Sequence, residues 1–170
     1  MGALSIAVSG RYSLRYAGLL SLLCLGLISC GFQLAERPLL GSSLQTLALE
    51  ADDQRSDLYL ALERALVAQD IRIDSSAPTR LTLVGVETGQ RVLSVSSRNV
   101  PREFEVFYTG GFVLQRGEAL LLESNPLTFT RDYNWSEFEV LGKVQEEADL
   151  RVLIVDDLVD ALLRQLATVP

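Results

Sequence analysis

The spacing of hydrophobic residues predicts two amphipathic helices in the chain. The first is expected over residues 57–69, where leucines and alanines recur on one face. Ser56 can cap this helix, and Asp57 lies in its first turn, where a negative charge favours the helix dipole. The second helix is expected over residues 141–167, because one apolar stripe continues for about seven turns. The stripe consists of Leu141, Val144, Ala148, Val152, Val155, Val159, Leu162 and Leu166.

Period-two alternation of apolar and polar residues predicts strands before and between these helices. Residues 44–50 form a short strand, and residues 80–97 form either one strand with a bulge or two short strands. The aromatic-rich segment 103–115 is a strong strand that continues through a tight hairpin into a returning strand at 119–133.

Three dipeptides interrupt this strand pattern. Gly89-Gln90 is expected to bend the second strand, and Gly110-Gly111 indicates a bulge or a close approach of another backbone. Asn125-Pro126 is expected to break the last strand.

The order of the elements predicts the fold class. Strands grouped together, with a helix at either side, are typical of an α+β domain. We therefore expect two helices packed on one face of a mostly antiparallel four-stranded sheet, which is a two-layer sandwich.

The first thirty residues have a different pattern. Arg11 and Arg15 precede an almost wholly apolar run at 16–28, and no acidic residue comes before Cys30. This run is much shorter than the roughly 20 residues of a membrane-spanning helix, but it suits the apolar region of a signal peptide. The run ends in Leu-Ile-Ser-Cys at 27–30, which resembles the lipobox of bacterial lipoproteins. A plain signal peptide with a chance cysteine, or an uncleaved anchor, is the alternative interpretation.

The lipobox resemblance implies how the chain is organised. It implies a signal peptide at 1–29, a lipidated tether at 30–43 and a single α+β domain at 44–170. Cys30 would carry a diacylglycerol and an N-acyl chain, and two or more buried chains anchor a protein stably. Lipoproteins of this type tend to carry Asp after the lipidated cysteine when they are retained in the inner membrane. Residue 31 is Gly, so we expect the protein in the outer membrane, with its domain facing the periplasm. No other cofactor is expected.

Composition narrows the classes of function. The chain has no His, so it lacks the commonest general base and the commonest neutral metal ligand. Of its two cysteines, Cys24 would leave with the signal and Cys30 would be acylated, so neither a thiol nucleophile nor a disulfide remains. The net charge of −7 would become −9 on loss of Arg11 and Arg15, which disfavours binding to nucleic acid. We therefore expect neither an enzyme nor a metal site.

Five stretches resemble, in their order along the chain, the lipopolysaccharide-assembly family LptE, also called RlpB. They are the lipidated start at 30–34, the leucine-rich helix at 58–71, the basic-acidic-aromatic strand entry at 102–106, the arginine-aromatic end of the next hairpin at 131–133 and the helix start at 141–150. No single stretch is unique to the family, so the specificity lies in their order. Gly142 departs from the family, which has a helix former there, and leads us to expect a later start of the last helix.

The resemblance implies a non-enzymatic protein that partners the outer-membrane barrel LptD as a heterodimer. The family plugs the barrel lumen, assists barrel assembly and contacts lipopolysaccharide on its way to the surface. A generic periplasm-facing lipoprotein adaptor, such as a secretin pilot or a barrel-assembly accessory, is the alternative.

The same resemblance implies candidate residues for lipopolysaccharide binding. Lys143 matches a basic position at the start of the last helix, and Arg98 or Arg102 matches the loop before the central strand approximately. Lipid A phosphates need such cations, and Arg can bind phosphate through two parallel hydrogen bonds. The alternative is that these residues are solvated or pair with a nearby glutamate, namely Glu103, Glu105 or Glu146.

Two further groups of side chains leave alternatives open. The sheet is rich in aromatic residues, which either fill the core or, on the outward face, pack on the barrel wall. The acidic pairs Asp52-Asp53, Glu146-Glu147 and Asp156-Asp157 are interpreted as solvated faces, since adjacent residues of a helix do not face each other.

Overall fold

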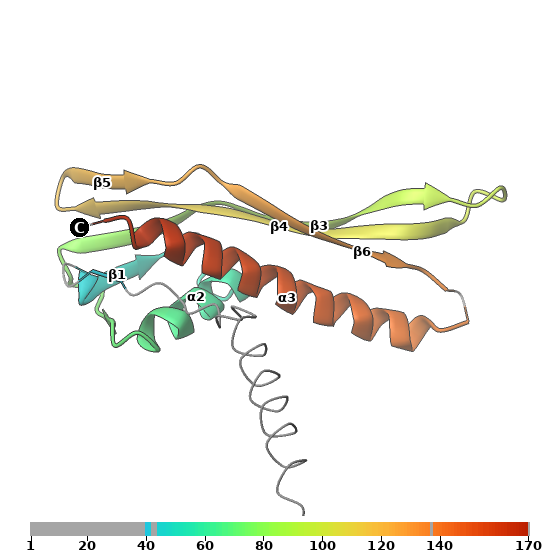
Figure 1. Ribbon diagram of the computed structural model, residues 1–170, viewed down its shortest axis with the longest axis horizontal. Helices are drawn as coiled ribbons and strands as arrows, with labels where there is room; N and C mark the ends of the chain where they lie inside the picture. The colour runs from blue at the N-terminus through green and yellow to red at the C-terminus, as the bar shows by residue number, and fades with distance from the viewer. Residues whose placement is uncertain (1–39, 42–43, 137, 170) are drawn as a thin grey trace, which may run out of the picture. The chain divides into compact units, whose positions relative to one another are not determined.

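The computed structural model describes residues 40–41, 44–136 and 138–169 (Figure 1). Cys30, the signal peptide at 1–29 and nearly all of the tether at 30–43 lie outside the described residues. Among the described residues, no helix has the length and hydrophobicity needed to cross a bilayer.

Six strands form one mixed sheet in the order β2-β1-β3-β4-β5, and β6 also pairs with β4. Their bounds are β1 Thr46–Glu50, β2 Arg72–Ile73, β3 Thr79–Val95, β4 Pro101–Arg116, β5 Ala119–Glu123 and β6 Leu127–Asn134. The strand that returns from β4 is broken as predicted, so that β5 pairs with the end of β4 and β6 with its beginning.

The prediction of a mostly antiparallel four-stranded sheet is wrong in two respects. β1 runs parallel to both of its neighbours, because helix α2 (Asp57–Val67) connects β1 to β2 and brings the chain back in the same direction. The two residues of β2 were missed because so short a strand carries no periodicity. The α+β class, with two helices beside one sheet, is confirmed.

Helix α2 begins at the predicted residue. The Ser56 hydroxyl accepts a hydrogen bond from the Tyr59 backbone N–H at 3.3 Å, and the Tyr108 hydroxyl accepts one from the Leu58 N–H at 3.4 Å. The face that contains Leu62 and Leu66 is buried, which makes α2 a core helix.

Helix α3 (Val140–Leu166) lies within one residue of its predicted bounds. The later start inferred from Gly142 is wrong, since Gly142 is inside the first turn. The predicted stripe is buried only in its second half: Leu141 is 88% exposed, Val144 56% and Val152 61%. The reason is that α2 has only eleven residues and lies beside the C-terminal part of α3 alone (Figure 1).

Two glycine predictions have different outcomes. β3 is a single strand whose pairing with β4 is irregular between Val84 and Glu87, where Gly85 has φ +60°, and again between Val92 and Val95, but not at Gly89. The close backbone approach predicted at Gly110-Gly111 is found at Gly111, where a Cβ would lie 2.9 Å from the Ser124 carbonyl oxygen. At Gly110 the neighbour is a side chain, because a Cβ there would lie 2.7 Å from the Leu58 Cδ2 atom. β4 and α2 are therefore in direct contact at this glycine.

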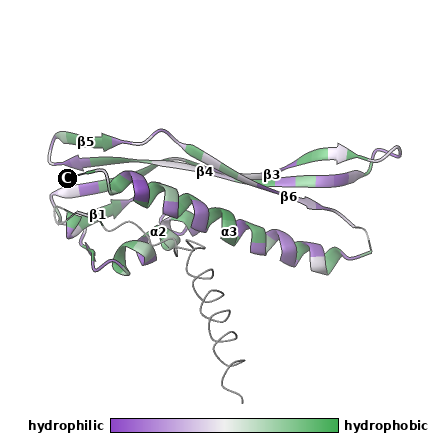
Figure 2. Cartoon of the chain, viewed as in Figure 1, coloured by the Kyte–Doolittle hydropathy of each residue, from purple (hydrophilic) through white to green (hydrophobic). Residues whose placement is uncertain are grey.

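Hydrophobic and hydrophilic residues follow one another along the strands (Figure 2), and they lie on different faces of the sheet. The face towards the helices carries the apolar core, including Val106, Tyr108 and Phe112, all buried. On the opposite face, Arg91 lies over the Phe107 ring at 5.7 Å, and the Thr109 and Thr128 hydroxyls are 2.8 Å apart. Most of the aromatic residues therefore serve the core, and Phe107 is the main aromatic side chain of β4 on the outer face.

Candidate functional site

The turn between β3 and β4 presents two arginines at one end of the sheet. The turn is closed by a hydrogen bond from the Ser96 N–H to the Val100 carbonyl at 2.7 Å and by one from the Val100 N–H to the Ser96 hydroxyl at 3.2 Å. Asn99, with φ +59°, supplies the left-handed residue that so tight a turn needs. Arg98 lies in this turn, and Arg102 follows it as the second residue of β4.

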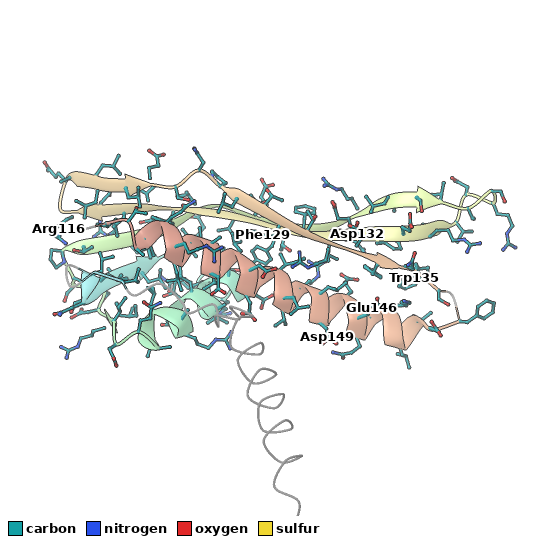
Figure 3. The ribbon with its side chains drawn as sticks, viewed as in Figure 1. Arg116, Phe129, Asp132, Trp135, Glu146 and Asp149 are labelled. Atoms are coloured by element: carbon teal, nitrogen blue, oxygen red, sulfur yellow. The ribbon has the colours of Figure 1, made fainter. Side chains whose placement is uncertain are left out.

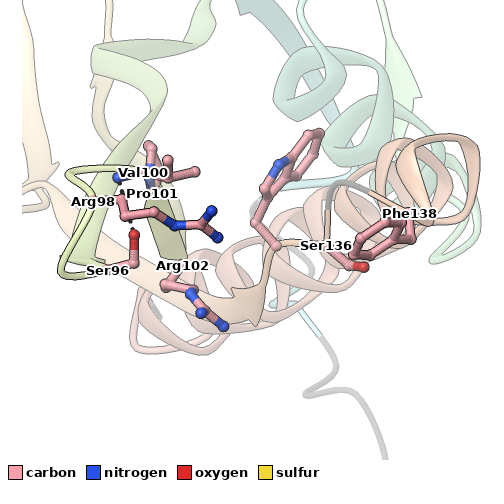
Figure 4. A pocket seen from close by; sticks show the side chains of 8 residues that line it. Ser96, Arg98, Val100, Pro101, Arg102, Ser136 and Phe138 are labelled. Carbon is pink, nitrogen blue, oxygen red and sulfur yellow. Dashed lines mark hydrogen bonds between the residues drawn. The ribbon is translucent and has the colours of Figure 1, made fainter.

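A cavity of about 270 Å³ lies between this turn and the connection from β6 to α3. In Figure 4, Arg98 and Arg102 extend from one side, and Ser136 and Phe138 lie on the opposite side. The lining residues are Ser96, Arg98, Val100, Pro101, Arg102, Trp135, Ser136 and Phe138. A second hollow, of about 600 Å³, shares Ser96, Arg102 and Trp135 with the first.

Trp135 joins the site to the rest of the sheet. Its backbone N–H donates to the Arg102 carbonyl at 2.7 Å, which continues the β4–β6 ladder for one more residue. Its ring packs edge-on against Phe104 at 5.8 Å, and Phe104 stacks on Tyr133 at 5.7 Å. These ring contacts fix one wall of the cavity, whereas the Phe138 side chain is 99% exposed. Figure 3 shows Trp135 at the end of β6, close to the start of α3.

The two arginines remain available to a ligand. In the described part of the chain, neither guanidinium makes an ion pair or a side-chain hydrogen bond, and both residues are exposed. Other arginines of this half of the sheet are engaged: Arg91 pairs with Glu105, and Arg131 pairs with Asp157. The cavity thus combines guanidinium donors, which suit phosphate, with aromatic walls, which suit an apolar chain.

Lys143, the third predicted cation, does not line this cavity. Its ammonium lies 2.7 Å from Glu146 Oε2, and its side chain is only 17% exposed. The geometry therefore matches the alternative considered for Lys143, a pair with a nearby glutamate. Trp135 and Phe138 were not predicted as site residues, although the aromatic-rich sequence around Trp135 was visible.

A polar network around the buried Tyr133 connects the first half of α3 to the sheet beside the site. The Tyr133 hydroxyl donates to Glu147 Oε2 at 3.0 Å and accepts a hydrogen bond from the Gln90 side chain. Arg151 binds Glu147 Oε1 at 2.8 Å and donates to the Thr88 hydroxyl at 2.9 Å. Burial, followed by the bond to Glu147 and its negative charge, raises the pKa of Tyr133 to about 12.

Three partly exposed acidic residues of α3 make ion pairs. Glu146 pairs with Lys143, Glu147 with Arg151 and Asp157 with Arg131. Over the residues that the structure describes, no three acidic or other ligating side chains come together to hold a metal ion.

The geometry defines an α+β domain of the class in which two helices lie beside one mixed sheet. Lipoprotein B from Nitrosomonas europaea has this fold, with a TM-score of 0.66 and 23% identity over 81% of this chain and 91% of that one. Rare lipoprotein B from Shewanella oneidensis is also similar, with a TM-score of 0.62 and 21% identity over 72% of this chain and 94% of that one. A minor lipoprotein from Acinetobacter baumannii matches with a TM-score of 0.60 and 21% identity over 74% and 92% of the two chains.

A family model described as "LptE: Lipopolysaccharide-assembly" matches residues 44–166, and the chain belongs to this family. A comparison with curated proteins gave no match. Membership confirms the resemblance found in the sequence and identifies the chain as a lipopolysaccharide-assembly lipoprotein of the outer membrane.

Proposed function

We propose that this lipoprotein binds and plugs the lipopolysaccharide-exporting barrel LptD, assists its assembly and contacts lipopolysaccharide during insertion into the outer leaflet. It acts by binding and not by catalysis. A diacylglycerol and an N-acyl chain on Cys30 anchor it to the outer membrane, with the domain facing the periplasm.

The cavity between the β3–β4 turn and Trp135 carries the part of the proposal that concerns lipopolysaccharide. Lipid A joins phosphate groups to acyl chains, and the cavity offers both kinds of partner within one site. Arg98 and Arg102 supply guanidinium donors, and none of the described residues that line this cavity is acidic, whereas Glu103 lines the adjoining hollow. Trp135 and Phe138 supply apolar surface beside them.

β1 and the arginine site lie at opposite ends of β3. β1 pairs with the first residues of β3, and the Arg98 turn follows its last residue. At about 3.3 Å per residue, the seventeen residues of β3 extend roughly 55 Å. The proposed lipopolysaccharide site is therefore well separated from β1 within the domain.

Charge reversal of the two arginines tests the site. Arg98→Asp with Arg102→Asp should weaken the binding of purified lipopolysaccharide to the full-length acylated protein by about tenfold or more. A charge-assisted hydrogen bond contributes roughly 1.5–3 kcal/mol, and about 1.4 kcal/mol corresponds to a factor of ten. Titration calorimetry or fluorescence with labelled lipopolysaccharide would measure the change.

The control is Arg55→Asp with Arg164→Asp, which changes the net charge equally at two exposed arginines outside the site. The control should bind lipopolysaccharide as the wild type does. An equal loss of lipopolysaccharide binding in both variants would mean that only the overall charge matters. Unchanged binding in the Arg98/Arg102 variant would refute the site. Lys143→Gln should have a smaller effect, since Glu146 already engages the ammonium.

A further inference from the structure

The first half of α3 carries an apolar stripe that is largely exposed. Leu141, Val144 and Val152 are exposed, and Ala148 lies between them on the same face. The adjacent side of this half, with Glu147 and Arg151, is held to the sheet through polar contacts. A helix of a globular domain normally buries its apolar stripe, whereas this half of α3 leaves its stripe exposed.

The exposed stripe continues the surface that α2 covers. Eleven residues correspond to about three helical turns, so Val144 lies in line with Val155, and Ala148 lies in line with Val159. Val155 and Val159 are buried in the half of α3 that packs against α2. The exposed side chains therefore lie where a longer α2 would cover them, beyond its first residue, Asp57.

The sheet beside the stripe also has an uncovered apolar position. Val92 of β3 pairs with Phe104, so the two side chains share the face towards the helices. Phe104 is covered by Trp135 and Tyr133, whereas Val92 is 48% exposed. The uncovered surface thus combines one side of α3 with the helix-facing side of β3.

The charges around this surface favour a basic partner. Along the edge of the stripe away from the sheet lie Asp149, which accepts a hydrogen bond from Gln145 at 2.8 Å, and Asp156, both exposed. Figure 3 shows Asp149 on the side of α3 that points away from the sheet. Asp52-Asp53 lies in the exposed turn just before α2.

This acidic border disfavours two other occupants. Anionic lipid headgroups would be repelled by it. A second copy of the chain, packed stripe to stripe, would bring the same aspartates close to one another, and like charges across an interface are costly.

We propose that this surface binds an amphipathic helix of a partner protein, with an apolar stripe flanked by Lys or Arg. The helix packs along α3 in line with α2 and completes the helical layer under the outer half of β3. The inference goes beyond the proposed function, since it concerns neither the arginine site nor the acyl anchor.

Site-specific cross-linking in living cells tests this proposal on the full-length lipoprotein. The photo-reactive residue p-benzoylphenylalanine replaces Val144 or Val152, and the cross-linked peptide is sequenced by mass spectrometry. Val67, an equally exposed valine at the end of α2, is the matched control position. We expect cross-links from Val144 and Val152, but not from Val67, to one segment with helical apolar spacing and Lys or Arg on its flanks.

Charge reversal provides the second readout. Asp149→Lys with Asp156→Lys should lower the cross-linking yield at Val144 at least about threefold. Glu118→Lys with Glu123→Lys, the same charge change on the distant β5 hairpin, should leave the yield unchanged. An equal yield in both variants would overturn the basic character of the partner.

The remaining outcomes overturn the proposal directly. They are an adduct with lipopolysaccharide or phospholipid, an adduct with a second copy of this chain, and no adduct at a normal level of protein. An adduct with a strand of a β-barrel would support the proposed function and still refute the helix.

Discussion

At the scale of single residues, Tyr133 joins the sheet to α3 through a buried hydroxyl. Its raised pKa has a defined effect on stability, because the unfolded chain ionises a tyrosine near pH 10 and the folded protein does so only near 12. The unfolded state therefore binds fewer protons between these values. The stabilisation is complete below pH 10 and is lost as the pH rises towards 12.

Tyr133→Phe tests this linkage. At neutral pH the variant should be less stable by about 0.5–1.5 kcal/mol, the usual contribution of one hydrogen bond. Between pH 10 and 12 its free energy of unfolding should fall less steeply than that of the wild type, as measured by urea denaturation at each pH. The comparison isolates Tyr133, because Tyr59 and Tyr108, whose pKa values are also raised by burial, are present in both proteins. Parallel pH profiles would contradict the assignment.

Cys30 is the residue on which the membrane attachment is proposed to depend. Cys30→Ala should leave the domain folded but unanchored, because residues 44–169 form the core without it. Fractionation should then move the protein from the membranes to the periplasmic fraction, with an unchanged circular dichroism spectrum. Mass spectrometry of the wild type should find Cys30 modified by a diacylglycerol and an acyl chain, and an unmodified Cys30 would refute the anchor.

The site could be predicted from the sequence only in part. Arg98 and Arg102 were reached through the family resemblance, since lone arginines in a turn carry no chemical signature. Trp135 and Phe138 were not reached, because the cavity exists only where the β3–β4 turn meets the β6–α3 connection. Contacts between segments so far apart leave no local pattern in the chain.

At the scale of elements, the helices and the antiparallel hairpin of β4 with β5 and β6 were predicted closely, and the parallel pairing of β1 was not. A period of 3.6 residues is a local property, and it located α3 to within a residue at either end. The parallel pairing of β1 with β2 and β3 depends on which strands meet after the α2 crossover, which alternation does not encode. For the same reason, the apolar stripe of α3 could be predicted from the sequence, but the exposure of its first half could not.

The close contact between β4 and α2 at Gly110 gives a prediction at this scale. Gly110→Ala should destabilise the domain by about 1–3 kcal/mol, because the new methyl group would collide with Leu58 in a packed core. Gly142→Ala is the matched control, since a Cβ there meets nothing within 4 Å and alanine favours the helix by up to about 1 kcal/mol. Chemical denaturation should therefore shift in opposite directions, and a neutral Gly110→Ala would mean that α2 does not press on β4.

At the scale of the whole molecule, the parts of the domain follow one another along the length of β3. The end near β1 is where the chain enters the sheet, the middle holds the α2–α3 core, and the far end presents the two arginines beside Trp135. The proposed lipopolysaccharide site therefore lies at the end of β3 away from β1.

The most direct test of the central claim is purification of the acylated protein from detergent-solubilised outer membranes, followed by native mass spectrometry. The account predicts a one-to-one complex with the large barrel LptD. Recovery of the protein on its own, under detergent conditions in which other outer-membrane complexes remain intact, would contradict it.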